Sequence, residues 1–295
     1  MPPSAPRQVA RVLASVLEVA GRYGCDGEAE VLSVDGANVV VGFTTGPATG
    51  LVARCPIRTD LLPGQVHGDP WRLREEVELG RWLAARDAPV VPPADPASGD
   101  PLPAGPHAAG GLDLTVWRRA RDPEPGELRP VELGRALRRF HDAAARYPTT
   151  GLRPLAPAVA DLDAVIDRLP ELGATPARVA DLRREWHDVA AELAAAPGAS
   201  PDASPGGQAL HGDPHPRNAL VLDGRLVWND LEDCCSGPVG WDLAVLRSNR
   251  VLDGAAAVRG YGHDPDDPAL DRFARGRELQ RLVWGAVREL GPAPA

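Results

Sequence analysis

The sequence contains no lysine, since all 32 of its basic residues are arginines. Chemistry that needs a lysine amine is therefore excluded, and every fixed side-chain cation is a guanidinium. Cysteine is also scarce: Cys234 and Cys235 are adjacent, whereas Cys25 and Cys55 are far away. This spacing fits neither a zinc site nor a disulfide framework. Reduced thiols and a cytoplasmic location are the expectation.

Long apolar runs are missing as well. No stretch approaches the roughly 20 apolar residues that a membrane-spanning helix needs, and the first 23 residues show helical spacing of apolar positions instead, at Val9, Val12, Val16 and Ala20. The net charge of −9 argues against nucleic acid as a partner, because phosphate binding needs a basic face. The same charge is compatible with a cationic ligand.

The order of expected elements indicates an α+β protein with two lobes. A chain of 295 residues with 43% apolar content is long enough for two domains. We expect a sheet lobe with helices over residues 1–117 and a mainly helical lobe over 118–295. The expected strands cover 30–34, 38–43, 51–55 and 112–117. The expected helices cover 70–86, 131–147, 159–169 and 176–196. The proline-rich segment 88–111 is expected to hold at most one short strand.

The tetrapeptide HGDP occurs twice, at 67–70 and at 211–214. In the first copy, Asp69 suits the N-cap of a helix and Pro70 its first position. The residue five positions after Asp69 is Arg74, a cation, so no second oxygen ligand follows. The first copy is therefore expected to be structural.

The second copy precedes a hairpin. Prolines and a glycine prevent a helix here, so His211 and His215 cannot form the paired histidines of a helical zinc site. An Asp-Gly turn at 223–224 predicts a two-residue hairpin loop, whose register sets Asn218 opposite residue 229, next to Asp230. These oxygen ligands, with Asp213 in the preceding loop, suit magnesium better than zinc.

The stretch HGDPHPRN, the hairpin after it and the stretch NDLEDCCSGPVGWDLA resemble the aminoglycoside phosphotransferase family, which has a protein-kinase-like bilobal fold. The resemblance implies that Asp213 is the catalytic aspartate and that Asn218 and Asp230 bind Mg²⁺. It also implies that Arg54 contacts the nucleotide phosphates, with Glu76 as its ion-pair partner.

The resemblance further implies that Asp242 holds the catalytic loop. Glu75 and Glu78 share a helix with Glu76, so the partner of Arg54 stays open at this point. The expected activity is transfer of the γ-phosphoryl group of ATP or GTP to a hydroxyl of an aminoglycoside-like or other cationic small molecule, and the acidic segment 260–271 is compatible with such a molecule. Neither nucleic acid nor a membrane is an expected partner.

Two alternatives remain open. One is a kinase-like protein that binds nucleotide without transferring phosphate. The other is a metal-dependent hydrolase with His211, Asp213, His215 and Asp230 as ligands.

Overall fold

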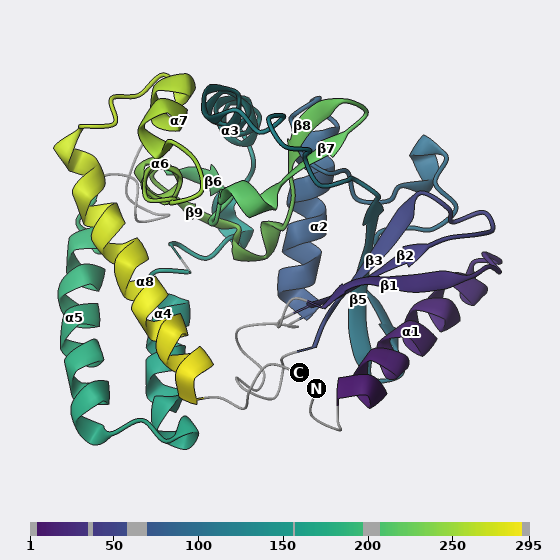
Figure 1. Ribbon diagram of the computed structural model, residues 1–295, viewed down its shortest axis with the longest axis horizontal. Helices are drawn as coiled ribbons and strands as arrows, with labels where there is room; N and C mark the ends of the chain where they lie inside the picture. Colours follow the sequence, from purple (N-terminus) through teal and green to yellow (C-terminus); the bar gives the residue numbers. More distant parts are fainter. Residues whose placement is uncertain (1–4, 35–37, 58–69, 156, 197–206, 291–295) are drawn as a thin grey trace. The chain divides into compact units, whose positions relative to one another are not determined.

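The computed structural model describes residues 5–34, 38–57, 70–155, 157–196 and 207–290. The chain divides into two compact units (Figure 1). The first comprises the described residues within Met1–Arg81 and Val91–Ala120, and the second comprises those within Trp82–Val90 and Arg121–Gly291. The boundary between the two lobes that we expect at residue 117 stays a prediction.

The first unit is built on a five-stranded antiparallel sheet with the order β1-β2-β3-β5-β4. The strands are β1 (Ala29–Val34), β2 (Asn38–Phe43), β3 (Leu51–Pro56), β4 (His107–Ala109) and β5 (Leu112–Arg118). Valine-rich segments with turns between them form these strands because branched side chains pack well on a pleated surface. Each expected strand is confirmed, and β4 is the short strand in the proline-rich segment.

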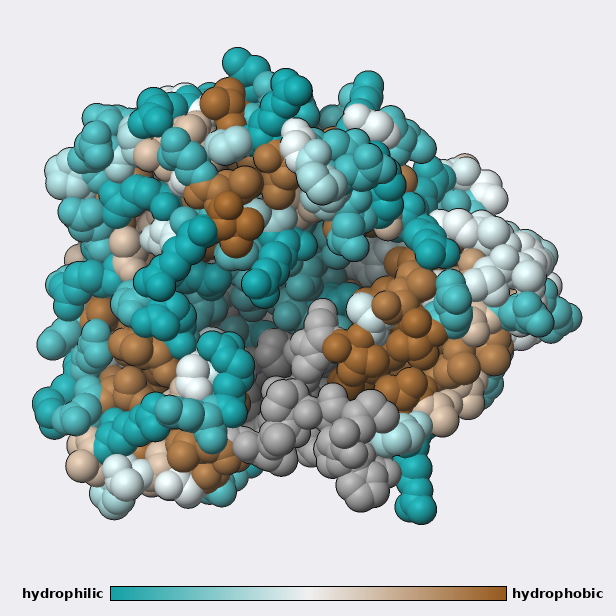
Figure 2. Space-filling model, viewed as in Figure 1, coloured by the Kyte–Doolittle hydropathy of each residue, from teal (hydrophilic) through white to brown (hydrophobic). Residues whose placement is uncertain are grey.

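Helix α1 (Ala5–Arg22) supplies part of the hydrophobic core of this unit. Val12 and Val16 are buried together with Val39 and Val41 of β2. Leu17, also apolar, stays 37% exposed, so not every apolar position of the helix faces the core. Figure 2 shows that hydrophobic side chains also gather on the surface over the strands of this unit.

The second unit is mainly helical. Its helices are α3 (Pro130–Ala144), α4 (Ala160–Arg168), α5 (Pro176–Ala194), α6 (Gly240–Arg247), α7 (Gly254–Tyr261) and α8 (Asp271–Leu290). Helices α5 and α8 run side by side (Figure 1). Helices α3 and α7 approach so closely that a Cβ on Gly134 would lie 1.8 Å from the Ala257 carbonyl oxygen. No helix in the described ranges is both long and apolar enough to cross a membrane.

Two short strand pairs lie within the helical unit. Strand β6 (Gln208–Leu210) pairs with β9 (Cys235–Gly237), and β7 (Ala219–Leu222) forms a hairpin with β8 (Arg225–Trp228). The observed register, with Leu222 opposite Arg225 and Ala219 opposite Trp228, confirms the hairpin prediction. The turn residues Asp223 and Gly224 have φ values of 49° and 74°, as a tight hairpin turn requires.

Helix α2 (Pro70–Ala84) begins at the proline that the sequence predicted and ends two residues before the expected position 86. The expected cap, Asp69, lies outside the described residues. The mixed architecture, an antiparallel sheet unit followed by a mainly helical unit, confirms the α+β prediction.

Candidate active site

A buried carboxylate holds the loop that carries the second HGDP. Asp242, in the first turn of α6, is fully buried. Its Oδ2 accepts a hydrogen bond of 2.9 Å from the His211 amide, and its Oδ1 accepts one of 3.0 Å from the Gly212 amide. The predicted task of Asp242 is therefore confirmed: one side chain fixes two successive peptide groups of the loop.

The backbone at Gly212 admits no other residue. Its φ of 88° is in the left-handed region, and a Cβ there would lie 1.8 Å from the Asp233 carbonyl oxygen. The Gly212 carbonyl accepts a 2.7 Å hydrogen bond from Trp241 Nε1. Two adjacent residues of α6 thus bind both backbone polar groups of this glycine. These hydrogen bonds fix the orientation of the backbone from which the Asp213 side chain projects.

His211 is a structural residue of this loop. It is fully buried, its Nε2 donates to the Asn229 carbonyl at 3.0 Å, and its Nδ1 accepts from the Asp213 amide at 3.4 Å. Burial lowers the pKa of His211, which favours the neutral ring. Because both ring nitrogens are engaged, His211 is not available as a metal ligand, and this geometry argues against the hydrolase alternative. Among the described residues, no three His, Cys, Asp or Glu side chains are grouped to hold a metal.

The hairpin brings the two expected oxygen ligands to one end. The Asn229 amide donates to the Asn218 carbonyl at 2.7 Å, so Asp230 follows directly after the last bonded pair. The Asn218 side-chain NH₂ donates to the Asp213 carbonyl at 2.9 Å, and its amide oxygen is the atom of that side chain which a hard cation prefers. Asp230 has a φ of 62° and a ψ of 70°, an uncommon conformation for a residue with a side chain. This donor set of amide and carboxylate oxygens fits magnesium.

The Asp213 carboxylate is 26% exposed and has a partner that the sequence did not reveal. Arg277 Nη2, from α8, donates to Asp213 Oδ1 at 2.7 Å. The two residues are 64 positions apart, and no local pattern marks Arg277 among the arginines of α8.

In the first unit, the alternation of side chains along β3 separates Arg54 from its neighbours. Ala53 and Cys55 belong to the core that includes α1, so Arg54 points to the opposite face of the sheet. There its Nη1 donates to Glu76 Oε1 of α2 at 2.6 Å, with side-chain exposures of 9% and 2%. The pair predicted from the resemblance is formed, with Glu76 as the partner.

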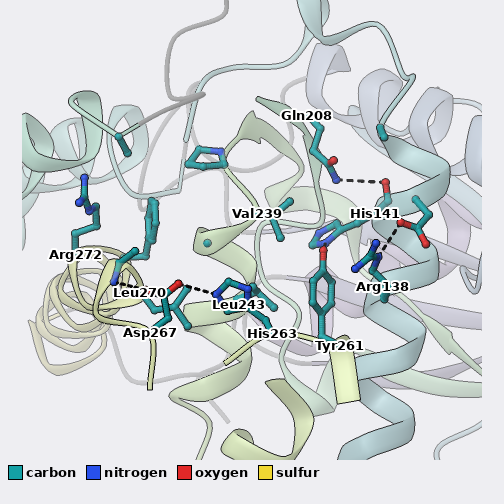
Figure 3. A pocket seen from close by; sticks show the side chains of 17 residues that line it. Arg138, His141, Gln208, Val239, Leu243, Tyr261, His263, Asp267, Leu270 and Arg272 are labelled. Atoms are coloured by element: carbon teal, nitrogen blue, oxygen red, sulfur yellow. Dashed lines mark hydrogen bonds and ion pairs between the residues drawn. The ribbon is translucent and has the colours of Figure 1, made fainter. Parts of the chain in front are cut away.

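A separate cavity of about 580 Å³ lies within the second unit, and its walls include neither Asp213 nor the two expected metal ligands. Figure 3 shows the His141 ring next to the Tyr261 hydroxyl on one wall. His141 Nδ1 lies 3.0 Å from that hydroxyl, and its Nε2 donates to Asp242 Oδ2 at 2.9 Å. Burial raises the pKa of Tyr261 to about 12, so the phenol stays neutral. The cavity wall therefore supports the carboxylate that holds the loop of the second HGDP.

An antiparallel sheet unit with a buried Arg-Glu pair and a helical unit with a clamped HGD loop define a protein-kinase-like fold. Solved structures agree. A choline/ethanolamine kinase family protein from Mesorhizobium loti has a TM-score of 0.59 at 22% identity, with 98% of this chain and 88% of that chain covered. Residues 65–290 match the phosphotransferase enzyme family, and the chain belongs to this family.

Two further solved structures share the fold. An amicoumacin kinase in complex with AMP-PNP, Ca²⁺ and Ami has a TM-score of 0.63 at 14% identity, covering 88% of this chain and 80% of that one. Spectinomycin phosphotransferase in complex with ADP and its antibiotic has a TM-score of 0.60 at 14% identity, covering 94% and 87%. No curated protein matches the sequence. At these identities the structural likeness establishes the fold alone.

Proposed function

We propose that the protein is a kinase that transfers the γ-phosphoryl group of ATP or GTP to a hydroxyl of a small molecule. Membership of the phosphotransferase family supports this activity. The observation that carries the proposal is the double clamp of Asp242 on the loop amides, because it fixes the backbone from which Asp213 projects. Phosphoryl transfer depends mainly on such positioning and on neutralising charge, so a rigid loop is what the reaction needs.

Asp213 is the proposed catalytic residue. The acceptor hydroxyl donates a hydrogen bond to the Asp213 carboxylate, and the hydroxyl oxygen attacks the γ-phosphorus in line. The bond from this phosphorus to the bridging oxygen breaks, the nucleoside diphosphate leaves, and the hydroxyl proton passes to Asp213 late in the step.

Asn218 and Asp230 would hold Mg²⁺, which when bound neutralises the phosphate oxygens of the nucleotide. Arg54 would contact the phosphates as a second positive charge, and the buried Glu76 carboxylate keeps its guanidinium in place. An arginine can serve here because its forked donors match two phosphate oxygens.

The acceptor expected from the sequence is an aminoglycoside-like or other cationic small molecule. The net charge of −9 supports a cation, and two proteins with this fold are kinases of the antibiotics amicoumacin and spectinomycin.

The experiment compares Asp213→Asn with the wild type in a coupled assay of nucleotide consumption against aminoglycosides, small alcohols and hydroxy acids. We expect Asp213→Asn to lose roughly 10²–10⁴-fold in turnover and to keep its nucleotide affinity, because Asp213 faces the acceptor. Asp188→Asn, an exposed carboxylate on α5, is the matched control and should stay active. Retention of most turnover by Asp213→Asn would refute the assignment, and nucleotide binding without consumption across the panel would favour the non-transferring alternative.

A further inference from the structure

Arg277 is held in place beside the proposed catalytic carboxylate. One prong of its guanidinium, Nη2, donates to Asp213 Oδ1 at 2.7 Å. The other prong, Nη1, donates to Gln280 Oε1, also at 2.7 Å, and Gln280 is itself 5% exposed. The side chain of Arg277 is 23% exposed. A buried amide one turn along the same helix therefore anchors the guanidinium, whose side chain stays partly exposed. The two bonds use two of its five N–H donors.

The other arginines of this part of α8 have different partners. Arg275 pairs with Glu192 of α5, and Arg281 pairs with Glu278 within its own helix. Those pairs are about half exposed and lie on helix surfaces. Arg277, by contrast, donates to the Asp213 carboxylate, which in the proposed function binds the acceptor hydroxyl. Its positive charge therefore lies beside the reacting group.

The charged groups close to His215, two residues after Asp213, are Asp213 itself and two arginines, Arg277 and Arg217. A cationic acceptor that approaches Asp213 thus meets a permanent guanidinium already bound to this carboxylate.

The acidic segment 260–271, which favoured a cationic acceptor, is partly used within the fold. Asp267 accepts from the Ala269 amide at 2.8 Å and pairs with His263 at 2.9 Å. Asp271 pairs with Arg247 at 2.8 Å. These carboxylates cap a turn and link helices, so the sequence of this segment overstates the negative charge that it offers to a ligand.

We propose that Arg277 determines acceptor specificity and that the acceptor, instead of the cation expected from the sequence, is an alcohol carrying a carboxylate, that is, a small hydroxy acid. This inference rests on the proposed kinase function. The acceptor carboxylate binds the guanidinium of Arg277, whose planar donors match two carboxylate oxygens. The acceptor hydroxyl then donates to Asp213 Oδ2, and its oxygen attacks the γ-phosphorus as described above.

The test uses acceptors of matched length that differ in charge: 4-hydroxybutyrate, 1,4-butanediol and 4-amino-1-butanol, with kanamycin as a polycation. Each is assayed with the full-length wild type, with Arg277→Gln and with Arg275→Gln, a matched arginine on the same helix. We expect the wild type to prefer the hydroxy acid, and Arg277→Gln to lose at least about tenfold in kcat/KM for this acceptor, mainly through KM, as loss of a charge-assisted pair implies. The neutral diol should lose less than the hydroxy acid does, and Arg275→Gln should behave as the wild type.

A second measurement tests binding of the hydroxy acid without requiring phosphoryl transfer. Millimolar 4-hydroxybutyrate should raise the melting temperature of the wild type but not of Arg277→Gln, since a ligand stabilises only the state that binds it. A wild type that prefers the amine or kanamycin, or a hydroxy acid that neither is phosphorylated nor shifts the melting temperature, would overturn the proposal. Binding of the hydroxy acid through Arg277 without nucleotide consumption by any acceptor would instead refute the kinase function and leave the specificity of Arg277 supported.

Discussion

Replacing Asp242 by asparagine tests the clamp on the loop that carries Asp213. The carboxylate accepts three hydrogen bonds: from the amides of His211 and Gly212, and from His141 Nε2. Oδ2 accepts two of these bonds and Oδ1 accepts one. An asparagine has one oxygen, so at best it keeps the pair of bonds at Oδ2 and turns its NH₂ toward the Gly212 amide.

The smallest cost of this change is one buried N–H without an acceptor, about 1–3 kcal/mol. For chains of 150–250 residues each kcal/mol lowers the melting temperature by about 2–4 °C, so a fall of roughly 2–12 °C is expected for the Asp242→Asn protein. Asp242→Ala removes all three acceptor contacts at a fully buried site and should cost more, about 3–5 kcal/mol.

The clamp also predicts a kinetic effect. If the loop shifts by about 1 Å, misplacement of Asp213 can reduce turnover by about 100-fold. Thermal unfolding followed by circular dichroism measures the first effect, and the nucleotide-consumption assay measures the second. Asp188→Asn is the control for loss of one carboxylate charge. An Asp242→Asn protein that melts within about 1 °C of the wild type, below the expected fall, and turns over normally would refute the view that this side chain holds the loop.

Three other predictions concern the metal ligands, the buried ion pair and pH. Asp230→Asn should raise the magnesium concentration needed for half-maximal activity more than Asn218→Ala does, because it removes a full charge from the ion; equal magnesium titrations would contradict this. Arg54→Met should cost about 3–5 kcal/mol of stability by leaving Glu76 buried without its arginine, and adding Glu76→Leu should recover stability but not activity in urea unfolding and kinetic assays. Since burial lowers the pKa of His211 from 6.5, the unfolded state binds a proton first as the pH falls. The neutral, buried ring of His211 therefore stabilises the folded state fully above about pH 6.5, and this stabilisation is lost as the pH falls toward the lower pKa of the folded state. The midpoint of urea unfolding should consequently fall more between pH 7.5 and pH 5 for the wild type than for His211→Gln.

Local features of the chain could be predicted because short-range physics determines them. The Asp-Gly turn fixes the hairpin register, and the two-residue period of a strand then sets Asn218 opposite residue 229. In the same way, Pro70 begins a helix, since its fixed φ suits the first turn and its missing N–H has no partner to lose there. Alternation along β3 also follows from the backbone alone and separates Arg54 from the core residues beside it.

The choice of Glu76 over Glu75 and Glu78 needed the tertiary structure. All three glutamates lie on α2, and the sequence pattern of a single helix does not say which of them meets the β3 arginine. The structure pairs Glu76 Oε1 with Arg54 at 2.6 Å. Packing of the helix on the sheet, not its propensity, decides this contact.

By itself the sequence determined the strands, the hairpin and the oxygen-rich loop, because each depends on residues within a few positions of one another. Only the tertiary structure joined His141 to Asp242 across 101 positions and Arg277 to Asp213 across 64. Such contacts depend on how α3, α6 and α8 pack, and a single arginine in a helix with several carries no local mark of its partner. The candidate catalytic aspartate could therefore be found from the sequence, whereas the cation that would select its acceptor could not.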